Sequence, residues 1–279
     1  MNVLLPTDFS ENSLNAISYA IDFWRHAACN FYIIHVNGFD TFMAGDSTYI
    51  LTEEQIEDMY IQPTNQKLSE LLNQIHEGFD VSDNQKFHTM ARQGFFLDTI
   101  RKAVLDHQID MIIMGTKGAS GLKQYIIGSN TADVITKVKC NTLVVPENAE
   151  YNSFKEIAFP TDYNITYDVN ILQPLIDILE NTGANLRFLH IKEKGVELNS
   201  DEQISRDMLN DFFENFKLSC HYLTNTKVED AIQCFVESRS IDLIIMVAKS
   251  LNYFQSILFH SKIEKVTYHT DIPFLVVHE

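Results

Sequence analysis

The chain has 279 residues, of which 45% are hydrophobic and 21% are charged, as in globular proteins rather than disordered or fibrous ones. Its 21 Lys and Arg against 38 Asp and Glu give a net charge of −17, the wrong sign for a protein that binds the phosphate backbone of nucleic acids. The sequence contains no apolar run of the ~18–20 residues that a membrane span needs and no signal peptide pattern, so a soluble, cytoplasmic protein without a membrane partner is expected.

Short apolar runs alternate along the chain with longer segments of helical periodicity. Strands are predicted at 2–6, 31–37, 86–91, 109–114 and 142–146, and again at 155–160, 185–191, 219–223, 241–247 and 273–277. Helices are predicted at 11–27, 53–77, 95–107 and 129–139, and again at 165–181, 201–217, 227–239 and 261–269. Continuous apolar runs are typical of parallel strands that are covered on both faces, so the pattern predicts two doubly wound α/β domains.

The two halves are related by an internal repeat. The run Leu5-Pro6-Thr7-Asp8 recurs as Phe159-Pro160-Thr161-Asp162. Near the end of each half, a shift of 132 residues from Asp110 to Asp242 aligns 37 positions, of which ten are identical. The first half is longer than the second, and the extra residues are assigned to the segment 38–63. This segment either folds over a ligand as a lid or packs on the neighbouring domain.

A short polar segment, 147–154, separates the halves and predicts domains at 1–148 and 154–279. The last strand of each half would lie at the edge of its sheet, and an exposed apolar edge invites pairing. We therefore expect the two domains to pack together as an intramolecular pseudo-dimer, and a further homodimer stays open.

Glycine is unevenly distributed, with eight of the ten in the first half and four of these between 115 and 128. This segment follows the fourth strand and leads into the fourth helix, beside the point where the winding of the sheet reverses and ligands bind. Gly115 and Gly118 would let backbone approach a phosphate and permit positive φ. Gly128 and Ser129 would present amide groups and a hydroxyl at a helix N-terminus, where the dipole favours an anion, and Lys117 would add a charge.

The spacing of these residues is G-x2-G-x9-G-S, which differs from the GxxxxGK[ST] and GxGxxG phosphate motifs. With Pro6-Thr7-Asp8 after the first strand and Leu143-Val144-Val145-Pro146 at the close of the half, it resembles the universal stress protein (UspA) family, and the repeat resembles a tandem member. The resemblance implies that each domain has a Rossmann-like, five-stranded parallel sheet of order 3-2-1-4-5. It also implies ATP binding in the first domain.

The same resemblance assigns residues to parts of the nucleotide. Asp8 is expected on the adenosine side, the backbone of Val36 at the adenine edge, and Met114 in the pocket lining. The glycine loop is expected to surround the phosphates and the ribose. The complete expected site is Pro6, Thr7, Asp8, Val36, Met114, Gly115, Lys117, Gly118, Gly128, Ser129 and Asn130. The histidines show no HxxxH or HExxH spacing, so a Mg²⁺ or Mn²⁺ ion is expected only as one carried by the ATP phosphates.

The second half departs from the glycine pattern. Under the shift of 132, Val247, Ser250 and His260 stand at the places of Gly115, Gly118 and Gly128, and Ser129 alone is kept, as Ser261. A Cβ then stands where backbone would approach a phosphate. The second domain is therefore predicted to be degenerate, to bind no ATP in this manner and to serve as a structural partner.

Two further pairs of residues have competing interpretations. Asp8 and its counterpart Asp162 either contact a ligand or cap the first helix, for which Ser10 competes. His35 and His190 occupy matching strand ends, and a structural role is favoured over a catalytic one for both.

These patterns together predict a cytoplasmic, nucleotide-responsive regulator of the universal stress type. The sequence shows neither a nucleophile–base pair nor paired carboxylates, so turnover of ATP is expected to be absent or slow. Two alternatives stay open. One is a slow ATPase or nucleotide-dependent transferase that uses Ser129 and Asp8, and the other is a purely structural interaction protein that binds no nucleotide.

Overall fold

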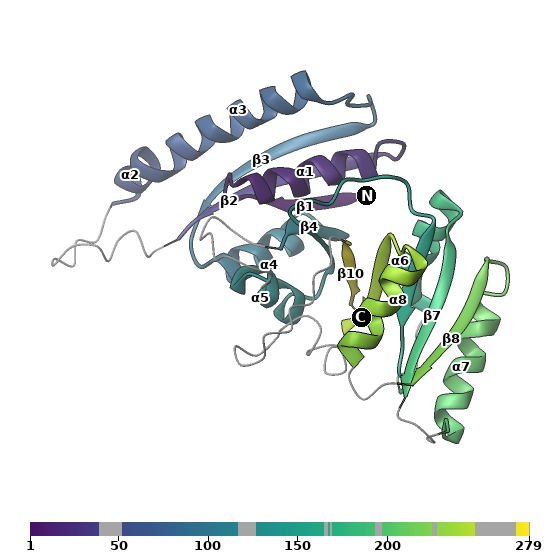
Figure 1. The fold of residues 1–279 in the computed structure, drawn as a ribbon. Helices are drawn as coiled ribbons and strands as arrows, with labels where there is room; N and C mark the ends of the chain where they lie inside the picture. Colours follow the sequence, from purple (N-terminus) through teal and green to yellow (C-terminus); the bar gives the residue numbers. More distant parts are fainter. Residues whose placement is uncertain are drawn as a thin grey trace. The chain divides into compact units, whose positions relative to one another are not determined.

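The computed structural model describes residues 1–38, 52–116, 127–164, 167, 169–192, 197–224, 228–248 and 272–278. These residues form two compact units, which Figure 1 shows as ribbons coloured along the chain. The first unit contains the described residues up to Thr142 except Ile127. The second contains Ile127 and the described residues from Leu143 onward.

The first unit is built on a parallel sheet. Its strands are β1 (Asn2–Pro6), β2 (Cys29–Asn37), β3 (Gln85–Gln93) and β4 (Met111–Gly115), in the order β3-β2-β1-β4. Each neighbouring pair is parallel, with Leu5 of β1 opposite Ile33 of β2. The side chains of Val3, Leu4 and Leu5 are fully buried, as expected for a central strand that helices cover on both faces.

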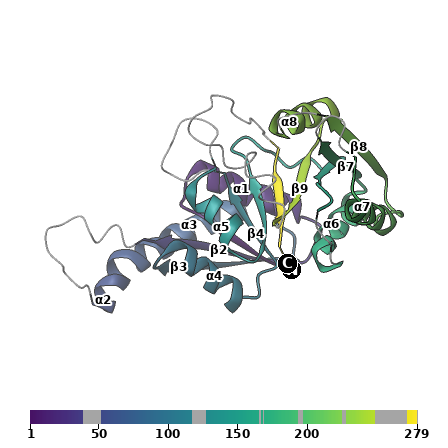
Figure 2. The same ribbon diagram turned by 90° about the horizontal axis from the view of Figure 1, so that it is seen from below.

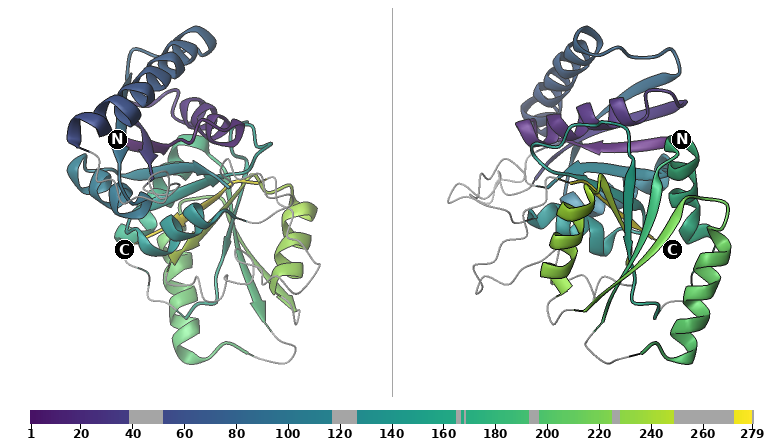
Figure 3. Two further views of the ribbon diagram at one scale, coloured as in Figure 1. Left: turned by 90° about the vertical axis from the view of Figure 1, so that its left-hand side faces the viewer. Right: turned by 45° about the vertical axis from the view of Figure 1, so that its right-hand side comes forward.

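Helices cover this sheet on its two faces. They are α1 (Glu11–Phe23), α2 (Glu53–Ile56), the π-helical turn η2 (Glu57–Ile61), α3 (Gln62–Gly78), α4 (Phe96–Asp106) and α5 (Ser129–Lys137). Figures 1 and 3 show α1 and α3 over one face of the sheet and α4 and α5 over the other. On the latter face Leu4 and Ile34 form one core cluster with Ile100 of α4 and Val134 of α5.

The first residues of the helices differ in how they are capped. The Ser10 side chain accepts a hydrogen bond from the Ser13 amide and caps α1. Thr52 and Gln55 form a capping box at the start of α2. At α5 the N-cap position is Gly128, which supplies no side-chain hydrogen bond, so the amide groups of the first turn lack this partner.

The second unit repeats the same plan. Its strands are β5 (Asn141–Val145, of which 143–145 group with this unit), β6 (Glu156–Pro160), β7 (Asn185–Lys192), β8 (Leu218–Thr224), β9 (Leu243–Val247) and β10 (Phe274–Val277). They lie in the order β5-β10-β9-β6-β7-β8. Its helices are α6 (Val169–Thr182), α7 (Ser200–Phe212) and α8 (Val228–Arg239). Figure 2 shows α7 alongside β7 and β8.

The predicted fold class is confirmed. The second half's own five strands lie in the predicted order 3-2-1-4-5, and the first unit shows the first four members of that order. Strand bounds agree with the prediction to within two residues at each end. The first helix ends at Phe23 rather than at residue 27, α6 begins at Val169 rather than at 165, and α7 ends at Phe212 rather than at 217. The helix predicted at 53–77 is divided into α2, η2 and α3. The predicted helix at 261–269 lies outside the described residues, and the domain bounds 1–148 and 154–279 stay predictions.

Candidate functional site

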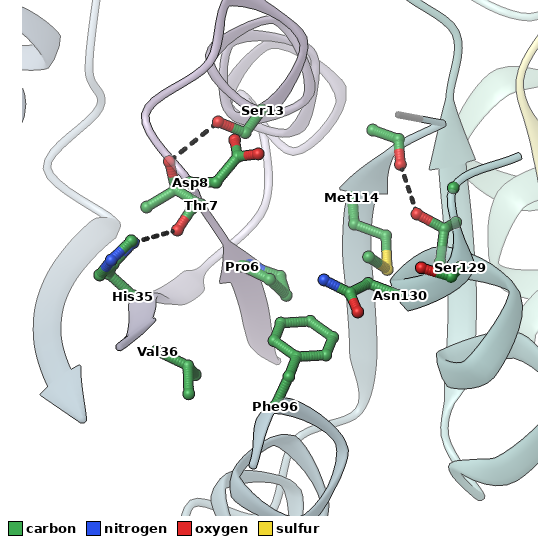
Figure 4. A pocket seen from close by; sticks show the side chains of 13 residues that line it. Pro6, Thr7, Asp8, Ser13, His35, Val36, Phe96, Met114, Ser129 and Asn130 are labelled. Carbon is green, nitrogen blue, oxygen red and sulfur yellow. Dashed lines mark hydrogen bonds between the residues drawn. The ribbon is translucent and has the colours of Figure 1, made fainter. Parts of the chain in front are cut away.

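A pocket of about 160 Å³ opens in the first unit where the order of the strands reverses between β1 and β4 (Figure 4). Its volume is smaller than the ~300–1,000 Å³ of a typical ligand cleft. Part of the glycine-rich segment, residues 117–126, lies outside the described residues. The lining comprises Pro6, Thr7, Asp8, Ser13, His35, Val36, Phe96, Met114, Gly115, Gly128, Ser129, Asn130 and Thr131.

The loop between β1 and α1 is held by its own side chains. Thr7 Oγ1 accepts a hydrogen bond from the Phe9 amide and is 3.0 Å from Ser13 Oγ of α1. Asp8 Oδ1 accepts from the amide of Ser10 at 3.0 Å and from its hydroxyl at 2.5 Å. Asp8 therefore lines the pocket and also orients the residue that caps α1, so the two interpretations of Asp8 are compatible.

The loop contains a residue in an unfavourable backbone conformation, and His35 supports it. Phe9 has φ 62°, which residues with a Cβ rarely adopt. Its ring packs against the His35 ring, with 4.8 Å between centroids and the ring planes tilted by 32°. His35 Nδ1 lies 2.7 Å from the Thr7 carbonyl oxygen, so this nitrogen donates. These contacts agree with the structural role expected of His35.

On the opposite side, β4 and α5 are tied together. Thr131 Oγ1 donates to the Gly115 carbonyl at 2.9 Å, and the Gly128 amide donates to the Thr116 carbonyl at 2.6 Å. The expectation that Gly128 offers an unpaired amide to a phosphate is therefore wrong for this group. The first-turn amides of α5 remain without a side-chain cap, so the helix N-terminus still favours an anion.

Gly115 has a structural reason to be glycine in addition to the predicted approach to a phosphate. Its φ is not positive, since among the described glycines only Gly94 and Gly183 adopt positive φ. A Cβ at Gly115 would lie 2.9 Å from the backbone oxygen of Asn12 in α1. The missing side chain thus allows α1 to approach the end of β4 closely.

The pocket has a polar periphery and an apolar centre. In Figure 4 Asp8 lies on the β1 side and Ser129 on the α5 side, across the pocket. The side chains of Met114 and Pro6 lie toward the middle of the view and Val36 lies below His35, and none of the three carries a charge. A ligand that fills this space would combine an apolar part with a polar, anionic part near α5.

The model of the universal stress protein family matches residues 1–146. The chain belongs to this family. It is 27% identical over 145 residues to universal stress protein MJ0531 of Methanocaldococcus jannaschii, covering 51% of this chain and 80% of the relative. It is 26% identical over 156 residues to universal stress protein MJ0577 of the same organism, covering 51% of this chain and 93% of the relative.

The likeness in fold extends over both halves. The crystal structure of a universal stress protein from Archaeoglobus fulgidus covers 99% of this chain and 97% of its own, with a TM-score of 0.71 and 21% identity. At that identity the comparison shows the fold alone. The fold of a universal stress protein is therefore present in the second half as well, beyond the residues that the family model matches.

The structure brings nine of the predicted site residues together in this family member. They are Pro6, Thr7, Asp8, Val36, Met114, Gly115, Gly128, Ser129 and Asn130. Lys117 and Gly118 lie outside the described residues. His35, for which a structural role was expected, also lines the pocket. Sequence reasoning missed three further lining residues, Ser13, Phe96 and Thr131. Each occupies the first turn of a helix that follows a strand, which is the one sequence signal that would have found them.

The second unit repeats the loop contacts of the first. Thr161 Oγ1 accepts from the Tyr163 amide at 3.0 Å, and His190 Nδ1 lies 2.9 Å from the Thr161 carbonyl oxygen. Tyr163 has φ 60° and stacks on His190 at 5.0 Å between centroids. At the place of Ser13, however, stands Tyr167, whose hydroxyl lies 2.7 Å from Thr161 Oγ1.

The glycine loop of the second unit can be compared only at its start. Val247 ends β9 at the place of Gly115, whereas Ser250, His260 and Ser261 lie outside the described residues. In the part of the chain that the structure describes, no group of three His, Cys, Asp or Glu side chains could hold a metal ion. Within the same part, no helix has the length and apolar character needed to cross a membrane.

Proposed function

We propose that the first unit binds an adenine nucleotide, with ATP as the expected ligand, in the pocket of Figure 4. The observation that carries the proposal is the pairing of an apolar centre with a helix N-terminus that has no side-chain cap. The apolar part suits a base, and the helix N-terminus suits a phosphate. Membership of the universal stress protein family supports this reading, because the glycine spacing resembles that of its ATP-binding members.

The proposal gives each side of the pocket a part of the ligand. Val36 would lie at the adenine edge and Asp8 beside the ribose, which its carboxylate can bind through a hydroxyl. Ser129 and Asn130 would meet the phosphates, together with Lys117 and Gly118. A Mg²⁺ or Mn²⁺ ion would arrive with the phosphates and need few protein ligands.

We further propose that nucleotide binding makes the protein a cytoplasmic regulator. The second unit then serves as a degenerate partner in a pseudo-dimer with the first, and further homodimers stay open. Two differences support this division of roles. Tyr167 stands in the second unit at the place of Ser13, and Val247 stands at the place of Gly115. The net charge of −17 argues against a nucleic-acid partner.

Calorimetric titration of ATP into the chain and into Gly128→Val tests the proposal. Gly128 has φ −59° and ψ 150°, which valine adopts without strain, and it lines the pocket, so we expect the new side chain to narrow the pocket. We expect at least a tenfold loss of ATP affinity. The matched control is Gly78→Val, where a Cβ at Gly78 meets nothing within 4 Å, and its affinity should equal that of the unaltered chain.

Mass analysis of small molecules released from freshly purified, denatured protein gives a second readout. An adenine nucleotide is the expected species. Absence of bound nucleotide together with no heat of ATP binding would reject the proposal and favour a purely structural interaction protein. Release of phosphate from bound ATP by the unaltered chain, but not by Gly128→Val, would favour the slow ATPase.

A further inference from the structure

Phe96 is placed in the pocket by the turn between β3 and α4. The Gly94 amide donates to the Asn37 carbonyl at 3.0 Å and so ties this turn to the end of β2. Gly94 has φ 152°, and a Cβ there would lie 3.0 Å from Thr99 Oγ1 of α4. The chain therefore enters α4 close to β2, and its first helical residue, Phe96, lines the pocket together with Val36.

The ring of Phe96 is available on its pocket side. The residue packs against the core cluster of the first unit, yet remains half-buried. Figure 4 shows its ring projecting from α4 toward Pro6 and lying between Val36 and Asn130. The ring thus forms part of the apolar centre of the pocket, away from Ser129 at the polar periphery.

The neighbouring aromatic residue is oriented differently. Phe95 is 69% exposed and is not among the residues that line the pocket. Phe95 therefore presents its phenyl ring to solvent, and Phe96 presents its ring to the pocket. The corresponding helix of the second unit, α8, begins with Val228 where α4 begins with Phe96, so of these two helices only α4 has an aromatic first residue.

We infer that Phe96 is a specificity-determining residue whose ring contacts the face of the nucleotide base. This inference rests on the proposed function. A phosphate or sugar placed against phenyl, valine and proline side chains would lose hydration without gaining hydrogen bonds. A planar heterocycle can instead stack on an aromatic ring while its polar edge reaches the backbone. Phe96 should then set the preference for ligands with a base over base-free polyphosphates.

Titrations of ATP and of inorganic tripolyphosphate into Phe96→Ala and Phe95→Ala test the inference. We expect Phe96→Ala to weaken ATP binding about tenfold, which corresponds to about 1.4 kcal/mol, and to change tripolyphosphate binding less than about twofold. Phe95→Ala should change neither. Phe96→Tyr, which keeps the aromatic face, should retain most of the ATP affinity, whereas Phe96→Leu, which keeps an apolar side chain, should not.

Three outcomes would overturn the inference. Unchanged ATP affinity in Phe96→Ala would show that the ring makes no base contact, and the proposed function would survive. Equal weakening of ATP and tripolyphosphate would show that the residue only maintains the shape of the pocket, as would full retention of affinity in Phe96→Leu. Failure of the unaltered chain to bind any nucleotide would reject the proposed function and the inference together.

Discussion

At the residue scale, Gly115 shows that one residue type can be required for a reason other than its usual one. Glycine in a phosphate loop suggests positive φ or close approach of a ligand. Here the near neighbour is protein, because the backbone of Asn12 occupies the space that a Cβ would need. The residue therefore couples α1 to β4 whether or not a nucleotide is present.

Gly115→Ala should lower the free energy of unfolding by about 1–3 kcal/mol, the usual cost of overpacking a tight contact. The added methyl group would lie 2.9 Å from a backbone oxygen, which cannot rotate away as a flexible side chain would. Urea unfolding without nucleotide measures the effect. Gly78→Ala is the control and should be neutral or slightly stabilising, since Gly78 ends α3 with open space around it. Equal stability of both variants would contradict this account.

At the element scale, each unit uses the same device where the first strand passes into the first helix. A threonine hydroxyl and a histidine ring hold an aromatic residue at positive φ, with Thr7, Phe9 and His35 in one unit and matching contacts in the other. The junction of β4 and α5 is held separately, by the Thr131 hydroxyl on the Gly115 carbonyl. The two junctions position opposite walls of the pocket.

Thr131→Val should lower the free energy of unfolding by about 1–3 kcal/mol, because it leaves the buried Gly115 carbonyl without this donor. Thr136 of the same helix offers a matched control. Its hydroxyl donates to the Ala132 carbonyl at 2.8 Å, but at the protein surface, where water can replace it. Thr136→Val should therefore stay within about 0.5 kcal/mol of the unaltered chain. Comparable losses in the two variants, measured by urea unfolding, would refute the argument.

At the scale of the whole molecule, a row of polar side chains in the second unit links stability to pH. In the second unit Glu156, Arg187, Ser219 and His221 form a hydrogen-bonded row across β6, β7 and β8. Arg187 pairs with Glu156 at 2.6 Å and donates to Ser219 Oγ at 2.7 Å. Ser219 Oγ accepts from Arg187 and lies within hydrogen-bond distance of His221 Nε2, 2.8 Å away.

Stability should fall on acidification because both titrating groups of this row bind protons more weakly in the folded state. Burial, then the charges of Arg239 and Arg187, lower the pKa of His221 below its ordinary 6.5. The hydrogen bond from Arg187 is the main cause that lowers the pKa of Glu156 below 4.5. The unfolded chain thus takes up protons first, so stability present above about pH 6.5 declines below it and declines further below about pH 4.5.

Unfolding free energies measured from pH 8 to pH 4 check this expectation. His221→Gln should remove the decline that begins near pH 6.5 and leave the one at lower pH. The control is His26→Gln, at an exposed position of the first unit, which should keep both declines. A profile of His221→Gln that parallels the unaltered chain at all pH values would disprove the role of the row.

The succession of strands and helices along the described chain was predicted from the sequence, because buried parallel strands read as continuous apolar runs, whereas the order of strands within the sheet was implied by the family resemblance. The glycine spacing and the Pro-Thr-Asp run likewise indicated most of the pocket. Only the tertiary structure decided that Ser13, Phe96 and Thr131 join it, that Asn12 excludes a side chain at 115, and that residues 143–145 group with the second unit. Sequence periodicity reports local burial. The first turns of α1, α4 and α5 are far apart in the sequence. They meet at one end of the strands because of the order of strands in the sheet and the packing of the helices against it.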